Sequence, residues 1–136
     1  MSTINEVREL VYQTFVTGWG TTTDFTFDNE KFDPPNDASW VRLSVRNTVS
    51  NQESLGAVGN RKFQRDAIIF TQIYDLANSS GLLNLDTLGE LVRTIFEGKT
   101  LSSQAYTTNT LLREVGTEGA WFVLIAETNL TYFDIK

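Results

Sequence analysis

The sequence contains neither cysteine nor histidine, and these two absences exclude several kinds of chemistry. Without cysteine there is no disulfide framework, no thiolate nucleophile and no cysteine-ligated metal site. Without histidine, the commonest general base and the commonest ligand of transition metals are also missing. Serine-hydrolase triads and zinc hydrolases are therefore excluded, and any catalysis would depend on carboxylates, Lys, Arg, Tyr or hydroxyl groups.

Positive charge and long hydrophobic runs are scarce as well. The 11 Lys and Arg residues stand against 17 Asp and Glu residues, so the formal net charge is -6. This balance argues against a protein that grips nucleic-acid phosphates over a wide surface, although nucleic acid could still slide through a pore. No stretch approaches the roughly 18 apolar residues that span a bilayer, and the N-terminus has no basic and apolar leader. We expect a soluble chain that is intracellular when it is made, with no membrane partner.

The composition is that of an ordinary globular domain without a catalytic motif. With 136 residues, 40% hydrophobic and 21% charged, the chain is expected to form one domain, residues 1–136. It has no phosphate-binding glycine loop and no nucleophile elbow. The carboxylate pairs Asp24/Asp28 and Asp33/Asp37 lie beside turns, where solvated acids are expected, and their spacing does not match a calcium-binding EF-hand loop. We therefore predict no enzyme activity, no cofactor and no metal site.

Two segments have the apolar spacing of amphipathic helices. The first starts after Thr3, which together with Glu6 fits a capping box. The second is predicted over residues 84–97, with Asn84 as its N-cap. Gly89 lies inside this second helix, where glycine is unfavourable, and its presence suggests a close packing contact.

Alternating or wholly apolar runs predict the strands, which we place at residues 24–28, 40–46, 61–74, 101–108, 110–115 and 121–134. Two prolines in the segment 33–37 indicate a turn, as does the polar segment 78–81. Residues 47–60 are polar and are predicted to form a long loop. The runs 67–70 and 121–125 are apolar on both faces, so their strands should be central or covered by a neighbouring subunit.

The order of elements is helix, strands, helix, strands. Successive strands joined by short turns favour a mixed, mainly antiparallel sheet, and both helices are expected to pack on one face of it. The fold class predicted from the sequence is therefore α+β.

The basic residues suggest one candidate surface. If the strands on either side of the 47–60 loop pair, a basic patch could form beside it from Arg42, Arg46, Arg61, Lys62 and Arg65. Such a patch could contact an acidic partner subunit or DNA. It could equally be a solvated sheet face with dispersed charges.

Several short motifs follow one another in a characteristic order: Phe32-Asp33-Pro34-Pro35, Trp40-Val41-Arg42-Leu43-Ser44-Val45, Gln52-x-Ser54-Leu55-Gly56, Arg61, Leu88-Gly89-Glu90-Leu91-Val92-Arg93-x-x-Phe96-Glu97-Gly98 and Trp121-Phe122-x-Leu124. Their succession, preceded by an N-terminal helix, resembles the tail-terminator, or tail-completion, proteins of long-tailed bacteriophages. The resemblance extends over nearly the whole chain.

The resemblance implies a small structural virion protein of the phage tail, without catalysis or cofactor. Subunits of this family form a homo-oligomer, usually a hexameric ring, that caps the tail tube and stops its polymerisation. The ring provides the head-joining surface, so its partners would be the tail tube protein and a head–tail connector protein. DNA would pass through the lumen without specific binding.

The motif match also implies a site for subunit or tube contacts. The residues that match the loop-and-strand motif are Gln52, Ser54, Leu55, Gly56 and Arg61. With the flanking arginines Arg42, Arg46 and Arg65 they form the predicted subunit and tube interface.

Two alternatives to a tail terminator stay open. The chain could be another tail or head–tail connector subunit, such as a tail-tube or head-closure protein. It could also be a small-ligand binding domain, which would need a deep pocket with converging polar groups.

Overall fold

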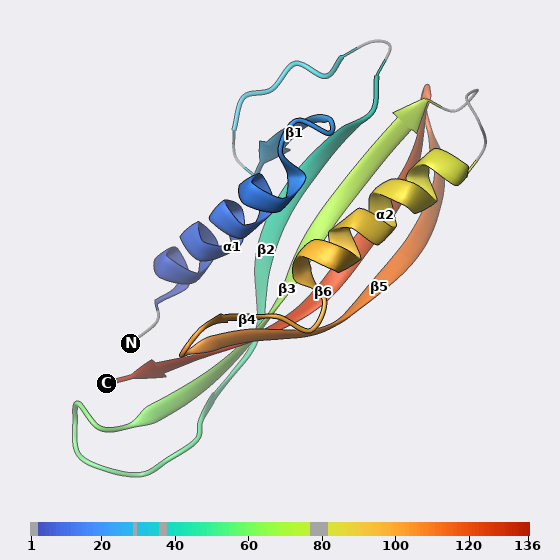
Figure 1. Cartoon of the computed structure of the whole chain (residues 1–136). Coiled ribbons are helices and arrows are strands. Elements are labelled where there is room, and N and C mark those ends of the chain that lie inside the picture. The colour runs from blue at the N-terminus through green and yellow to red at the C-terminus, as the bar shows by residue number, and fades with distance from the viewer. Residues whose placement is uncertain (1–2, 29, 36–37, 77–81) are drawn as a thin grey trace.

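Six strands form one sheet in the order β1-β2-β3-β6-β5-β4, with two helices beside it (Figure 1). The computed structural model describes residues 3–28, 30–35, 38–76 and 82–136. Along the chain the elements are α1 (Ile4–Trp19), β1 (Asp24–Phe27), β2 (Trp40–Gln52), β3 (Lys62–Leu76), α2 (Leu83–Phe96), β4 (Thr100–Ser102), β5 (Ala105–Glu118) and β6 (Trp121–Ile135).

The long strands pair antiparallel along nearly their whole length. All 15 residues of β3 pair with β6, and β3 forms a hairpin with β2 on its other side. The short β1 is parallel to β2 and closes one edge of the sheet, while β4 closes the other. A bulge between Asn47 and Val49 interrupts the β2–β3 ladder, and bulges of this kind increase the local twist of a strand.

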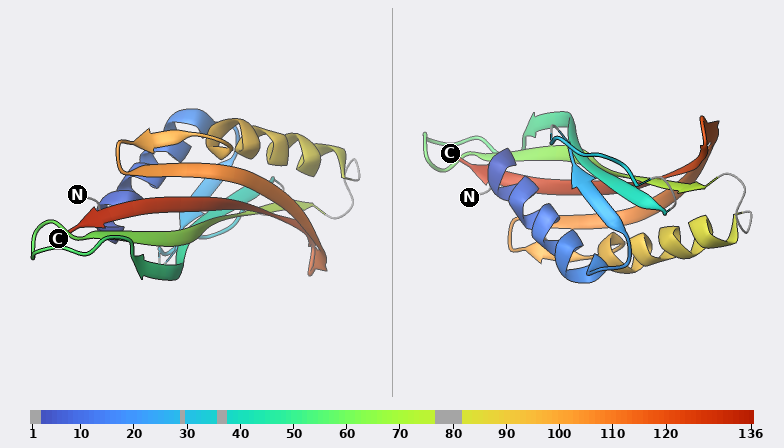
Figure 2. Two further views of the ribbon diagram at one scale, coloured as in Figure 1. Left: turned by 90° about the horizontal axis from the view of Figure 1, so that it is seen from below. Right: turned by 90° about the horizontal axis from the view of Figure 1, so that it is seen from above.

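The sheet curls around α1 and α2, which lie in its hollow (Figure 2). Phe15 of α1 is fully buried and is the centre of an aromatic cluster, with Trp19 stacked at 5.1 Å, Phe96 of α2 at 6.2 Å and Phe25 edge-on at 5.4 Å. The sheet supplies alternate residues of its strands to the same core, among them Val41, Leu43, Ala67, Ile69, Ile73, Leu124 and Leu130. One core therefore joins both helices to the concave side of the sheet.

The predicted α+β class is wrong, because the fold is dominated by strands. Of the described residues, 51% lie in strands and 24% in helices, and the sheet is a curled half-barrel that wraps around the two helices instead of an open layer beneath them. The sequence pattern underestimates the length of the strands, because the residues at their outer ends are polar. Backbone pairing extends β2 and β5 beyond the residues that alternate in hydrophobicity.

Three local predictions are corrected by the structure, two in strands and one at the start of α2. Residues 47–52, predicted as loop, belong to β2. The strands predicted at 101–108 and 110–115 are instead the short β4 and one long strand, β5. Asn84 does not cap α2; its side chain donates to the Ser39 hydroxyl at 3.2 Å.

Other local predictions are confirmed by the structure. Thr3 and Glu6 form the capping box of α1. Gly89 packs closely, since a Cβ there would lie 3.0 Å from a methyl of Leu124 and 3.1 Å from one of Leu112. The turn predicted at 78–81 and the end of the one at 33–37 lie outside the described residues.

Replacing Phe15 by alanine should destabilise the fold, because it removes the ring that joins α1 to α2 and β1. We expect Phe15→Ala to lower the free energy of unfolding by about 3–5 kcal/mol in urea denaturation. The neighbouring Val16 is 38% exposed, and Val16→Ala should change stability by no more than about 0.5 kcal/mol. Equal losses for the two variants would contradict the central role of the aromatic cluster.

Candidate subunit interface

The convex face of the sheet, opposite the helices, is not covered by either helix (Figure 2). Its side chains alternate with the core residues and include many apolar groups, namely Val49, Ile68, Phe70, Tyr106, Leu111 and Ile125. Leu111 is 54% exposed and Val49 is 49% exposed. The ion pair between Arg113 and Glu127, at 2.6 Å, lies among them. The strands that are apolar on both faces, β3 and β6, are the two central strands of the sheet, which confirms the first of the two alternatives predicted for them.

The hairpin of β2 and β3 projects beyond the helices as an arm, residues 50–65 (Figure 1). The end of this arm is tied together by the Glu53 N–H, which donates to the Lys62 carbonyl at 2.7 Å, and by the Lys62 N–H, which donates to the Ser54 hydroxyl at 2.9 Å. Its tip presents Leu55 and Val58, which are 94% and 83% exposed. Aliphatic side chains this exposed gain nothing from the fold of a lone chain, and they favour a contact with another molecule.

Three cations surround one aromatic ring at the base of the arm. The charged groups of Arg61, Arg65 and Lys136 lie 5.7, 5.5 and 5.8 Å from the centroid of Phe63. The Arg61 Nε–H also donates to the carbonyl of Lys136 at 3.0 Å, which joins the C-terminus to the arm. Cation–π contacts of this kind hold basic side chains in place without neutralising their charge.

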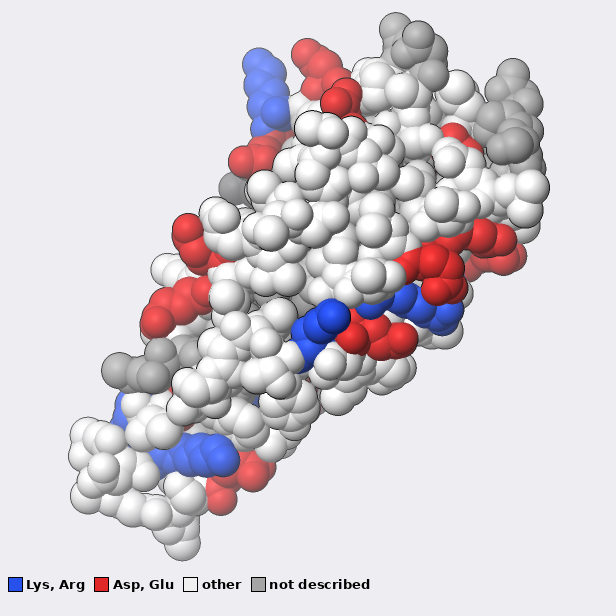
Figure 3. Space-filling model, in the orientation of Figure 1, with Lys and Arg blue, Asp and Glu red and all other residues white. Residues whose placement is uncertain are grey.

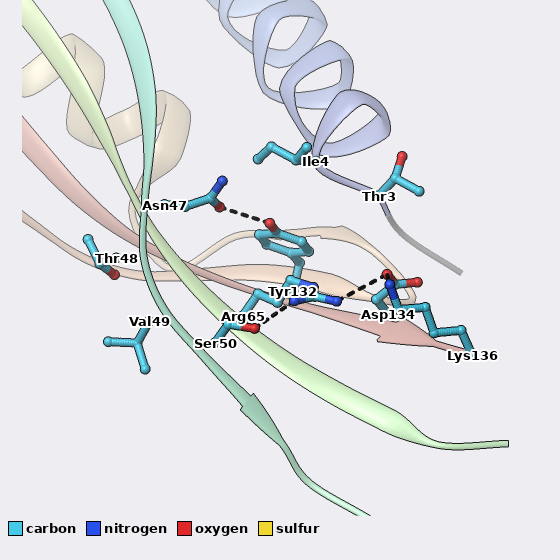
Figure 4. A pocket seen from close by; sticks show the side chains of 10 residues that line it. All are labelled: Thr3, Ile4, Asn47, Thr48, Val49, Ser50, Arg65, Tyr132, Asp134 and Lys136. Atoms are coloured by element: carbon cyan, nitrogen blue, oxygen red, sulfur yellow. Dashed lines mark hydrogen bonds and ion pairs between the residues drawn. The ribbon is translucent and has the colours of Figure 1, made fainter. Parts of the chain in front are cut away.

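A pocket of about 450 Å³ opens beside this base, between the start of α1, the bulge of β2 and the end of β6 (Figure 4). Arg65 spans it, donating to the Ser50 hydroxyl at 2.6 Å and approaching Oδ2 of Asp134 at 3.5 Å. The Tyr132 hydroxyl donates to Oδ1 of Asn47 at 2.9 Å. Burial raises the pKa of the Tyr132 phenol, so this group stays protonated at neutral pH and keeps its donor role.

Asp134 has an unusual position in this pocket. The residue is only 5% exposed, and its Oδ1 is buried without a hydrogen-bond donor among the described residues. An unsatisfied buried carboxylate oxygen costs free energy unless a ligand or partner supplies a donor.

The structure brings together some of the predicted site residues and separates others. Gln52, Ser54, Leu55, Gly56 and Arg61 all lie on the arm. Arg65 lies at its base, in the pocket.

Arg42 and Arg46 lie apart from the residues of the arm, so the five basic residues named above do not form one patch. Arg42 and Arg46 lie on the convex face, whereas Arg61 and Arg65 lie on the concave side. Arg42 stacks over the Trp40 ring, 5.5 Å from its centroid, and Arg46 pairs with Asp28 at 2.8 Å.

Sequence reasoning missed Tyr132, Asp134 and Lys136. They reach the pocket only because β6 pairs with β3, which sets Tyr132 opposite Arg65 and Asp134 opposite Phe63. The sequence does place Asp134 on the same strand face as Leu130 and Tyr132, since the three alternate along the terminal strand.

The described part of the chain contains no group of three or more acidic residues that could hold a metal ion. A groove between α1 and α2, lined by groups such as Thr14, Thr17, Leu91 and Ile95, brings no acid or base pair together. Figure 3 shows this side of the molecule, where most charged side chains lie around the margins of a wide uncharged area. Neither of the two described helices is long and apolar enough to cross a membrane.

No family model matches the sequence, and no curated protein is similar to it. Among solved structures the chain is similar to a protein whose name gives no function, with a TM-score of 0.66 and 15% sequence identity. The similarity covers 92% of this chain and 94% of that chain. At this identity the similarity shows a shared fold alone.

Removing the Arg65 guanidinium should leave the buried Asp134 carboxylate poorly compensated. We expect Arg65→Met to lower the free energy of unfolding by about 2 kcal/mol in chemical denaturation. When Asp134 is already replaced by Asn, the Arg65→Met change should lower the free energy of unfolding by at least about 1 kcal/mol less than it does in the unsubstituted protein, because the two side chains interact directly.

Arg46→Met is the matched control, since its pair with Asp28 is exposed and should contribute no more than about 0.5 kcal/mol. If Arg65→Met were as harmless as Arg46→Met, the ion pair in the pocket would have no structural role.

Proposed function

We propose that this protein is a tail terminator: a structural subunit that forms a ring on the end of a phage tail tube, ends tube polymerisation and offers the surface to which the head joins. The observation that carries the proposal is the apolar surface that a lone chain leaves uncovered. It comprises the tip of the arm and the convex face.

Assembly is the simplest physical explanation for these two surfaces. Transfer of exposed apolar area from water to an interface contributes about 25 cal/mol per Å². The arm tip and the convex face are different parts of the surface, so a contact of one with another region of a second copy would be heterologous. Contacts of that type close into rings when the rotation between subunits allows it.

The specific role in a phage tail is supported by the order of the sequence motifs. The Gln52-x-Ser54-Leu55-Gly56 motif of the resemblance falls on the arm, which is where a projecting contact element would be useful. The net charge of -6 suits the wall of a channel that must let DNA slide without binding it. Tail-tube and head-closure subunits would use similar surfaces, and the outcome of assembly separates them from a terminator.

The test is negative-stain microscopy of the purified protein, alone and after mixing with isolated tail tubes of the phage that encodes it. A terminator forms closed rings of one size and attaches to tube ends. Open tubes would favour a tail-tube subunit. Rings that do not attach to tube ends would favour a head-closure role. Monomers that ignore tubes would contradict the whole proposal.

A charge on the arm tip should disrupt assembly without affecting the fold. We expect Leu55→Asp to raise the concentration at which rings form by at least about tenfold in light scattering, because burying a carboxylate in an apolar contact is costly. Thr117→Asp places the same charge on an exposed position of β5 far from the arm and should leave ring formation unchanged. Equal behaviour of the two variants would exclude the arm tip from the interface.

A further inference from the structure

The pocket at the base of the arm has the chemistry of a receptor for an uncharged amide. Arg65 and Lys136 both line it, so an entering cation would meet two positive charges. An entering carboxylate would meet the buried Oδ1 of Asp134 and would still leave this oxygen without a donor. A neutral group that both donates and accepts hydrogen bonds can pair with the Asp134 carboxylate and with the cationic side chains of Arg65 and Lys136. The amide is the commonest such group in proteins.

The remaining lining of the pocket selects for an apolar neighbour to that amide. Ile4 at the start of α1 contributes an aliphatic group, and Tyr132 contributes an aromatic ring that lies between Ile4 and the ionic groups (Figure 4). The best-fitting occupant is therefore a short uncharged peptide with one or two aliphatic side chains.

The arm tip of this chain is such a peptide. Residues 54–60 read Ser-Leu-Gly-Ala-Val-Gly-Asn and carry no charge. Leu55 and Val58 project into solvent, and the N–H groups of residues 55–59 donate to no residue that the structure describes. The segment thus offers free amide donors next to aliphatic side chains, in the combination that the pocket requires.

An arm cannot reach the pocket at its own base. Ser50 pairs with Arg65 and Gln52 with Phe63, and the Glu53 to Lys62 hydrogen bond continues this ladder toward the tip. The paired strands hold the tip away from the pocket (Figure 1). A second copy of the chain must supply the occupant.

We propose that the arm tip of one subunit inserts into the Asp134 pocket of the next, where the Asp134 side chain rotates to expose its buried Oδ1 to a backbone amide of residues 55–59. This inference rests on the proposed ring and defines its contact. Arm and pocket are different surfaces, so the contact is head-to-tail and leaves the pocket of one end subunit free until the ring closes.

The absence of native cysteine allows a direct test by disulfide cross-linking. The double variant Leu55→Cys/Ser50→Cys places one thiol on the arm tip and one at the mouth of the pocket. After mild oxidation of the assembled protein, denaturing gels should show a covalent ladder that ends at the size of the closed ring. The control pair Leu55→Cys/Thr117→Cys moves the second thiol to the far end of β5 and should give no ladder.

The possible outcomes separate this inference from the function on which it rests. Rings that form but fail to cross-link, or that cross-link equally in the control pair, would overturn the arm-in-pocket contact and leave the terminator proposal intact. A covalent product that stops at dimers would overturn the head-to-tail arrangement. Failure of the unsubstituted protein to form rings would contradict the proposed function itself.

Discussion

The length of the strands, compared with that of the helices, is the constraint on which the rest of this structure depends. At about 3.3 Å per residue, the 15 residues of β3 and of β6 extend for about 50 Å. At 1.5 Å per residue, α1 and α2 reach only about 24 and 21 Å. The two helices can therefore fill the hollow of the curled sheet over part of its length only, and the ends of the strands extend past them.

This mismatch determines where the functional surfaces lie. On the concave side, the helices and sheet close a core around Phe15, which leaves the convex face without a cover. Beyond the helices, β2 and β3 continue as a paired arm, and the aliphatic side chains at its tip are exposed. The pocket forms where the arm leaves the body, and there the unsatisfied oxygen of Asp134 is buried. Each of these features is unfavourable for an isolated chain, and the assembly that we propose would compensate for the exposed arm tip and the unsatisfied oxygen.

The helices and the core faces of the strands could be predicted from the sequence, because the relevant signals are local. The capping box of Thr3 and Glu6 and the alternation around Ile69 are read within one element. The ends of the strands could not be predicted in this way. Polar residues such as those at 47–52 are held in the sheet by backbone pairing with another strand, β3. The pocket could not be predicted from the sequence for the same reason, because Arg65 and Asp134 are brought together only by the register between β3 and β6. The fold class could not be predicted either, because the curl of the sheet around the helices arises from the twist and pairing of all its strands together.

The central claim is that a lone chain is an incomplete unit, and the mass of the assembled species tests it most directly. Native mass spectrometry should be recorded on the unsubstituted protein over a hundredfold range of concentration. The account predicts one oligomer of fixed stoichiometry, in equilibrium with monomer and with few intermediates, because the closed ring satisfies every arm and every pocket. A mass of 15.3 kDa at every concentration would contradict it.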